Sequence, residues 1–192
     1  MFKSFAFVAP VLAVILAAAA PPPVAGPPVI PGLIPPPEVA ANPANRLTVT
    51  LSNGGTVVIL LRPDLAPAHV ERIRTLAKRH FYDGLTFHRV IPGFMAQGGD
   101  PKGTGEGGSE LPDLKAEFSQ VPFLRGTLGA ARAQEKDSAN SQFFIMLAPN
   151  PELDFDYTVM GRVISGMDAV DRIAPGEPPA EPTKIVSATI GG

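Results

Sequence analysis

The sequence predicts an all-β domain with two helices. Some eight short runs are rich in β-branched and aromatic residues, and glycine, proline and asparagine separate them. Only two runs have the apolar periodicity of an amphipathic helix. The chain has 192 residues, of which 45% are hydrophobic. That is enough for one core, and a second full domain is not expected.

The N-terminal part of the chain differs in composition from the rest. Lys3 precedes an apolar run that ends in four alanines, which is the layout of a secretory signal peptide. We assign 1–20 to this signal peptide; the alternatives are an uncleaved membrane anchor and a helix packed on the domain. Frequent prolines then favour polyproline II, so we predict a semi-rigid linker over 21–45 and one domain over 46–192. We expect an exported, periplasmic monomer.

The predicted domain begins with a hairpin and a helix. The strand-like runs 47–51 and 56–61 are separated by an Asn-Gly step, which suits a tight turn with positive φ. Asp64 and Pro67 are typical of a helix start, and an apolar stripe continues to about Arg79.

A second hairpin is predicted from Leu85 to Gln97, with its turn at Pro92 and Gly93. Alternation of side chains puts Met95 and Gln97 on one face of the second arm and Phe94 and Ala96 on the other. The turn brings Arg89 back beside them, so a cation, an amide and large apolar groups converge. The alternative is that Arg89 forms a surface ion pair and the apolar residues are core.

The glycines of 103–108 formally satisfy G-x-G-x-x-G. A dinucleotide site requires a buried strand before this motif and a helix starting within it, and neither is predicted, so we interpret the segment as a glycine-rich loop. The remaining elements are strands over 126–132 and 141–147, a turn and strand over 153–163, a helix over 167–173 and a strand over 185–190.

Composition and motifs exclude several function classes. The net charge is −2, and no Lys/Arg cluster is interleaved with aromatic residues, so we expect no nucleic-acid partner. The absence of cysteine excludes disulfides and thiolate catalysis. His69, His80 and His88 lack the spacing of metal ligands, and there is no G-x-S-x-G motif, so we predict neither a metal site nor serine hydrolysis.

The segment FHRVIPGFMAQGGD, residues 87–100, resembles the signature of the cyclophilin family of peptidyl-prolyl cis/trans isomerases. The resemblance extends over about 47–190. It implies a closed, eight-stranded antiparallel barrel capped by two helices, with no cofactor, and it implies Arg89 as the catalytic residue. The implied substrate-binding residues are Phe94, Met95, Gln97, Ala131, Arg132, Gln142, Phe144, Leu153 and Tyr157. Arg132 stands where the family usually has asparagine.

The resemblance implies an isomerase that acts on proline-containing polypeptides. Together with the predicted signal peptide, it leads us to expect that the protein assists the folding of exported proteins. Twisting an X-Pro bond breaks amide resonance and gives the proline nitrogen a lone pair. A permanently charged guanidinium that donates to this nitrogen stabilises the twisted state more than the planar one. The alternative function is a non-catalytic module or chaperone that only binds proline-containing segments.

Overall fold

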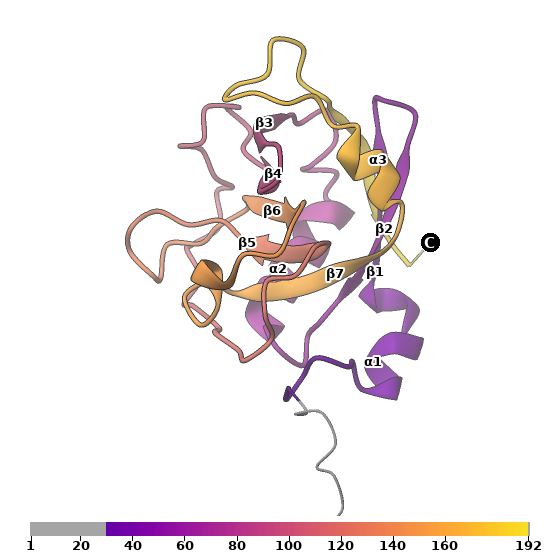
Figure 1. The fold of residues 1–192 in the computed structure, drawn as a ribbon, viewed down its shortest axis with the longest axis vertical. Coiled ribbons are helices and arrows are strands. Elements are labelled where there is room, and N and C mark those ends of the chain that lie inside the picture. The colour runs from indigo at the N-terminus through magenta and orange to yellow at the C-terminus, as the bar shows by residue number, and fades with distance from the viewer. Residues whose placement is uncertain (1–29, 192) are drawn as a thin grey trace, which may run out of the picture.

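The computed structural model describes residues 30–191 and shows one eight-stranded antiparallel sheet with helices against it (Figure 1). The strands are β1 (Arg46–Leu51), β2 (Thr56–Leu61), β3 (Phe87–Ile91), β4 (Met95–Gly98), β5 (Thr127–Ala130), β6 (Phe143–Met146), β7 (Val159–Ser165) and β8 (Ile185–Ile190). The predicted all-β class is thus confirmed. The predicted signal peptide and the linker as far as residue 29 lie outside the described residues.

In the described part of the chain, three α-helices and two 3-10 helices accompany the sheet. The α-helices are α1 (Pro37–Ala41), α2 (Pro67–Lys78) and α3 (Met167–Asp171), and the 3-10 helices are η1 (Pro43–Asn45) and η2 (Pro151–Leu153). Helices α2 and α3 lie where the sequence predicted two helices, whereas α1 was not predicted. Between residues 30 and 191 no helix is long and apolar enough to cross a bilayer.

The expectation of a closed barrel is wrong. The strand order is β3-β4-β6-β5-β7-β2-β1-β8, so β3 and β8 are the two ends of a curled half-barrel. Near these ends two isolated bridges join Thr86 to Lys184 and Val90 to Gly176, and Phe87 N donates to Thr183 O at 3.0 Å. The segment 174–184 that precedes β8 contains four prolines. Proline has no N–H to donate, so this segment pairs with β3 only at isolated positions and forms no continuous ladder along it.

Part of the predicted polyproline linker is helical and packs on the domain. Val39 of α1 and Asn45 of η1 are buried, and Asn45 Nδ2 donates to Val39 O at 2.7 Å. Further upstream, Arg62 Nη2 donates to Gly32 O at 2.7 Å. For residues 37–45 the expectation of polyproline II is therefore wrong, because burial of Val39 stabilises a short helix that begins with proline.

Helix α2 begins without the predicted Asp64 cap. The residue before the helix is Ala66, which offers no side-chain acceptor, and Asp64 instead accepts two hydrogen bonds from Arg62. The carboxylate of Glu117, from a distant loop, accepts from the N–H groups of Ala68 and His69 at 3.2 and 3.1 Å. A negative charge at this end also suits the helix dipole, so a tertiary contact replaces the local cap.

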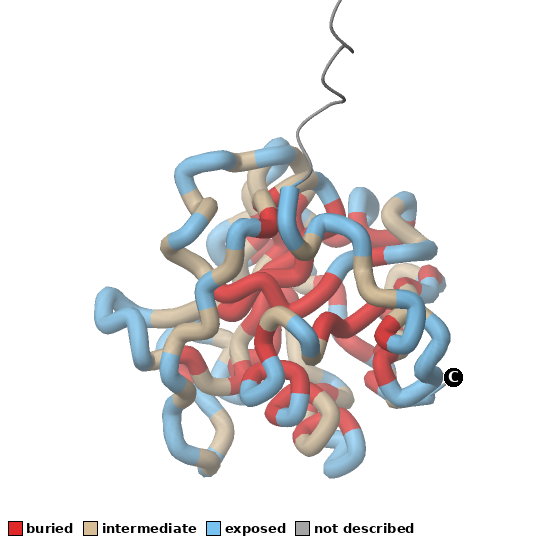
Figure 2. Tube along the Cα trace, turned by 90° about the horizontal axis from the view of Figure 1, so that it is seen from below, coloured by how far each residue is buried: buried red, intermediate tan, exposed pale blue. Residues whose placement is uncertain are grey.

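Buried residues occupy the interior of the curled sheet (Figure 2). The larger apolar cluster joins β1, β2 and β8 to one face of α2 and to α3, and includes Leu61, Leu76 and Val170. A second cluster lies under β4, β6 and β7 and contains Met95 and Phe144. These are two of the residues expected to bind substrate, so the second cluster forms the base of the site.

Candidate active site

The hairpin of β3 and β4 places Arg89 as the sequence predicted. Arg89 is paired with Gln97 in the ladder, and Ile91 with Met95. Gly93 has a φ of 73°, which glycine adopts without strain and which the turn requires. Phe94 lies in this turn rather than in the strand, so it joins Met95 at the site although simple alternation put the two on opposite faces.

Nine of the ten predicted site residues line one cavity of about 140 Å³; they are Arg89, Phe94, Met95, Gln97, Ala131, Arg132, Phe144, Leu153 and Tyr157. Phe144 at its base is 5% exposed and stacks on Phe123, with 5.7 Å between ring centroids. Tyr157 meets Phe144 edge to face at 5.9 Å. The ring of Phe144 lies against Gly129, where any Cβ would overlap it. The cavity therefore has a rigid aromatic base.

Arg89 reaches the cavity from its rim. Its side chain is 41% exposed, and Nε donates to Oε2 of Glu177 at 2.7 Å. The two terminal nitrogens of the guanidinium have no side-chain or backbone partner among residues 30–191. The surface ion pair that was the alternative interpretation is thus present, and it leaves two N–H₂ groups available to a ligand.

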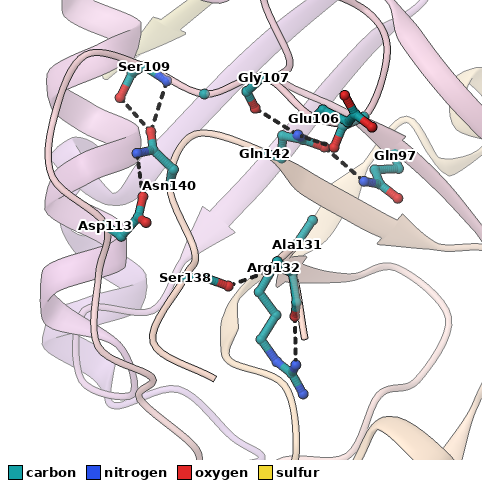
Figure 3. Close-up of a pocket in the computed structure, with 13 residues that line it drawn as sticks. Gln97, Glu106, Gly107, Ser109, Asp113, Ala131, Arg132, Ser138, Asn140 and Gln142 are labelled. Carbon is teal, nitrogen blue, oxygen red and sulfur yellow. Dashed lines mark hydrogen bonds between the residues drawn. The ribbon is translucent and has the colours of Figure 1, made fainter. Parts of the chain in front are cut away.

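Gln142, the tenth predicted residue, lies in an adjoining cavity of about 520 Å³ that shares Gln97, Ala131 and Arg132 with the first (Figure 3). Its Nε2 donates to the carbonyl oxygens of Gly105 and Gly107 at 2.9 and 2.8 Å. Its Oε1 accepts from Gln97 Nε2 at 2.9 Å. Gln142 therefore holds the glycine-rich loop beside β4 and orients the amide of Gln97.

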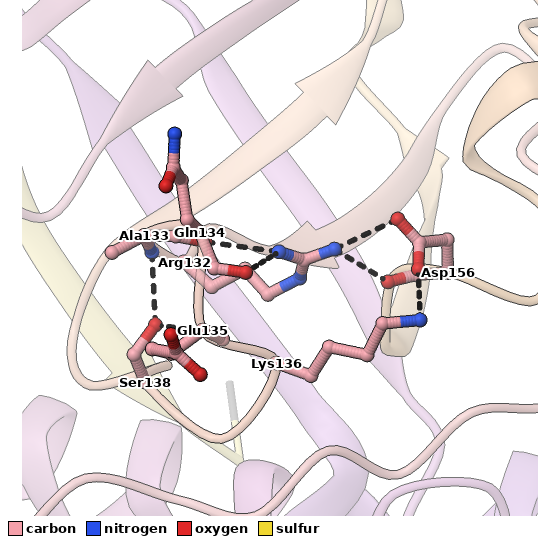
Figure 4. A network of polar contacts seen from close by, with 7 residues as sticks. All are labelled: Arg132, Ala133, Gln134, Glu135, Lys136, Ser138 and Asp156. Atoms are coloured by element: carbon pink, nitrogen blue, oxygen red, sulfur yellow. Dashed lines mark hydrogen bonds and ion pairs between the residues drawn. The ribbon is translucent and has the colours of Figure 1, made fainter.

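Arg132, which follows β5, turns its guanidinium into a network beside the cavity (Figure 4). Nη1 donates to the carbonyl oxygens of Ala133 and Gln134 at 2.9 and 3.1 Å. Nη2 donates to the carbonyl oxygen and Oδ2 of Asp156 at 3.2 and 2.8 Å. The guanidinium carbon lies 4.4 Å from the ring centroid of Tyr157. These contacts connect the segment that follows β5 to the segment around Asp156. Because they engage the guanidinium, the main chain of Arg132 is the part that can contact a ligand.

The glycine-rich loop wraps around the carboxylate of Asp100, which accepts from the N–H groups of Lys102 and Gly105 at 2.8 and 2.6 Å. Burial works against the charged form, but these N–H groups outweigh it and hold the pKa of Asp100 below its usual value. His88 lies under the same loop, and burial lowers its pKa. Neither ring nitrogen of His88 has a hydrogen-bond partner among the described residues.

Two acidic residues outside the predicted set form ion pairs with it in the described part of the chain. Glu177 pairs with Arg89, and Asp156 pairs with Arg132 and with Lys136, whose Nζ lies 2.7 Å from Asp156 Oδ1. The hydrogen bond from Lys136 and the positive charges of Lys136 and Arg132 outweigh desolvation and lower the pKa of Asp156. Glu177 is 88 positions from Arg89, so no local pattern in the sequence points to this contact. Within the described part of the chain no three His, Cys, Asp or Glu side chains are grouped to hold a metal.

A family model described as "Cyclophilin type peptidyl-prolyl cis-trans isomerase/CLD" matches residues 46–190. The chain belongs to this cyclophilin family. Curated relatives agree: a probable peptidyl-prolyl cis-trans isomerase of Brucella suis is 51% identical over 167 residues, which cover 79% of this chain and 85% of the relative. Peptidyl-prolyl cis-trans isomerase B of Bacillus subtilis is 43% identical over 129 residues, covering 66% and 89%. The enzyme class is therefore peptidyl-prolyl cis-trans isomerase.

Solved cyclophilins share the fold. A cyclophilin from Hirschia baltica aligns with a TM-score of 0.73 and 29% identity, over 78% of this chain and 74% of its own. A cyclophilin-type isomerase from Cryptosporidium parvum, whose structure was determined in the presence of the dipeptide Ala-Pro, aligns with a TM-score of 0.71 and 25% identity. That alignment covers 77% of this chain and 99% of the other.

Proposed function

We propose that this protein accelerates rotation about X-Pro bonds in protein substrates, with Arg89 as its catalytic residue. The observation that supports the proposal is the position of Arg89 at the rim of the cavity of about 140 Å³, with both terminal guanidinium nitrogens unengaged within residues 30–191. The same cavity has an apolar base that includes Met95 and Phe144. A proline ring is small and apolar and suits this base, and the Cryptosporidium relative studied with Ala-Pro supports such a ligand.

The reaction needs electrostatic stabilisation and no bond cleavage. Rotation breaks the amide resonance against a barrier of about 18–20 kcal/mol and leaves a lone pair on the proline nitrogen. An N–H donor of Arg89 aimed at this nitrogen gains strength as the bond twists, so it stabilises the transition state more than the planar bond. Arginine retains its charge at any working pH.

Arg89 cannot account for the whole acceleration. A millionfold increase in rate corresponds to about 8 kcal/mol, and one charge-assisted hydrogen bond contributes about 1.5–3 kcal/mol. The remainder requires the proline ring to be held in the cavity while the adjoining backbone is fixed on one side. The backbone N–H and C=O of Arg132 have no hydrogen-bond partner among the described residues, so they can pair with an extended substrate.

An isomerisation assay on an Ala-Pro peptide tests the proposal. Arg89→Ala is expected to lower kcat/KM by about ten- to a hundredfold while peptide binding persists. Arg89→Lys should also be poor, because it loses the planar fork. Arg79→Ala is the matched control, since Arg79 is also an exposed arginine in an ion pair, with Glu110. Equal activity of the parent and Arg89→Ala would refute the mechanism, and a parent that binds peptide without isomerising it would favour the binding-module alternative.

We also propose that the protein is exported and assists the folding of exported polypeptides as a monomer, either released or held at a membrane by an uncleaved N-terminus. The apolar run before the proline-rich segment supports this proposal. Cell fractionation with N-terminal sequencing tests it: recovery from the cytoplasm with an intact N-terminus would refute export. Light scattering of the purified protein tests the monomer.

A further inference from the structure

Glu177 lies next to Arg89 although it comes from the loop between α3 and β8. Its Oε2 accepts from Arg89 Nε at 2.7 Å, within the range of charge-assisted hydrogen bonds. We propose that Glu177 is a positioning residue for the isomerisation: it orients the guanidinium so that the terminal nitrogens face the substrate. The inference rests on the proposed function, in which Arg89 is the catalytic residue.

The loop is fastened to β3 on both sides of Glu177. Val90 N donates to Gly176 O at 2.8 Å and Gly176 N donates to Val90 O at 2.9 Å, so the residue before Glu177 is locked to the residue after Arg89. At the far end of the loop, Phe87 N donates to Thr183 O at 3.0 Å. Gly176 has a φ of 143°, and a Cβ there would meet Pro179. A glycine is therefore needed for the bend that brings the carboxylate to Arg89.

The contact leaves the reactive end of Arg89 unobstructed. An exposed arginine side chain has many rotamers, and ordering it costs conformational entropy. If the side chain is already ordered before substrate binds, this cost is not added to the activation free energy. Glu177 accepts from Nε, the guanidinium nitrogen farthest from the tip of the side chain. The side chain is thereby oriented, and both terminal N–H₂ groups have no hydrogen-bond partner within residues 30–191. The carboxylate also reduces the positive potential of Arg89, but the Glu177 side chain is 52% exposed and solvent screens this effect. We expect orientation to outweigh it.

The same loop offers a control. Glu181 is an exposed glutamate four positions after Glu177, and among the described residues its side chain has neither a hydrogen bond nor an ion pair. It shares the charge and the loop with Glu177 but not the contact with Arg89. Glu177→Gln is a second comparison, since its amide oxygen can still accept from Nε without a charge.

Steady-state isomerisation of an Ala-Pro peptide, with thermal unfolding of each variant, tests the inference. Glu177→Ala is expected to lower kcat about two- to fivefold, the range set by exposed ion pairs, with KM and Tm unchanged. Glu177→Gln should recover more than half of the lost rate, and Glu181→Ala should match the parent. In an Arg89→Ala background, Glu177→Ala should have no effect, because it acts through Arg89.

Two results would overturn the inference while leaving the proposed function intact: a kcat of Glu177→Ala equal to or above that of an active parent, or the same loss in the Arg89→Ala background. A fall in Tm with unchanged kcat would also overturn it, because Glu177 would then serve stability only. An inactive parent would instead refute the proposed function, and the inference with it.

Discussion

Replacing Arg132 by alanine is expected to loosen the wall between the two cavities and destabilise the protein. The Arg132 side chain is 9% exposed and forms hydrogen bonds with three backbone carbonyl groups, those of Ala133, Gln134 and Asp156. It also lies over the ring of Tyr157. An asparagine at this position would be too short to reach these partners together, so the contacts are specific to the arginine.

The size of the loss follows from these contacts. A hydrogen bond from a charged donor contributes about 1.5–3 kcal/mol and a cation–π contact about 0.5–2 kcal/mol, but neighbouring contacts are not additive. Asp156 remains paired with Lys136 in the variant, so no carboxylate is left without a partner. We expect a loss of about 2–3 kcal/mol in the free energy of unfolding. For a domain of this size the corresponding fall in Tm is about 5–10 °C.

Activity should respond differently to Arg132→Ala and to Arg89→Ala. The guanidinium of Arg132 is engaged within the protein, so the variant affects substrate only through the position of its main chain. We therefore expect a higher KM and a kcat within about twofold of the parent. Urea unfolding followed by far-UV circular dichroism, with peptide kinetics, measures both effects.

The matched control is Arg172→Ala, which removes an exposed i,i+4 pair with Asp168 and should cost no more than about 0.5 kcal/mol. An equally small loss for Arg132→Ala would refute the assigned network. A fall in kcat as large as that of Arg89→Ala would show that Arg132 takes part in the chemistry.

Three further predictions concern other parts of the domain. Gly129→Ala should cost about 1–3 kcal/mol and raise KM, because its Cβ would overlap the ring of Phe144; unchanged unfolding and kinetics would contradict this packing. Burial lowers the pKa of His88, so the unfolded chain binds the proton more readily than the folded one. The free energy of unfolding should therefore be highest above about pH 6.5, the ordinary histidine pKa, and should fall as pH drops towards the folded-state pKa. The urea midpoint should change more between pH 7 and 5.5 in the parent than in His88→Gln. Equal changes would show that His88 does not cause this pH dependence. A chain that begins at residue 46 should be less stable by about 2–3 kcal/mol than one that begins at 30, because it loses the buried face of α1 and the hydrogen bond from Arg62; equal urea midpoints would show that 30–45 does not stabilise the domain.

Local features of the sequence were enough to predict the eight strands and the two main helices. Alternating apolar residues, the Pro92–Gly93 turn and the pairing of Arg89 with Gln97 all depend on residues within a few positions of one another. Helix α1 was missed because a helix of five residues is too short to be stable alone. It forms because Val39 is buried against the domain, which composition cannot indicate.

The β-rich class and the hairpin that presents Arg89 could be predicted from the sequence alone, and a resemblance to the cyclophilins identified the residues that line one cavity. Three features became visible only in the folded molecule: the sheet ends at β3 and β8 without closing, Glu117 caps α2, and Glu177 contacts Arg89. Periodicity and turn chemistry act between neighbours in the chain, so a sequence displays them directly. Contacts such as that of Glu177 with Arg89, 88 positions apart, exist only once the folded sheet has brought the two segments together.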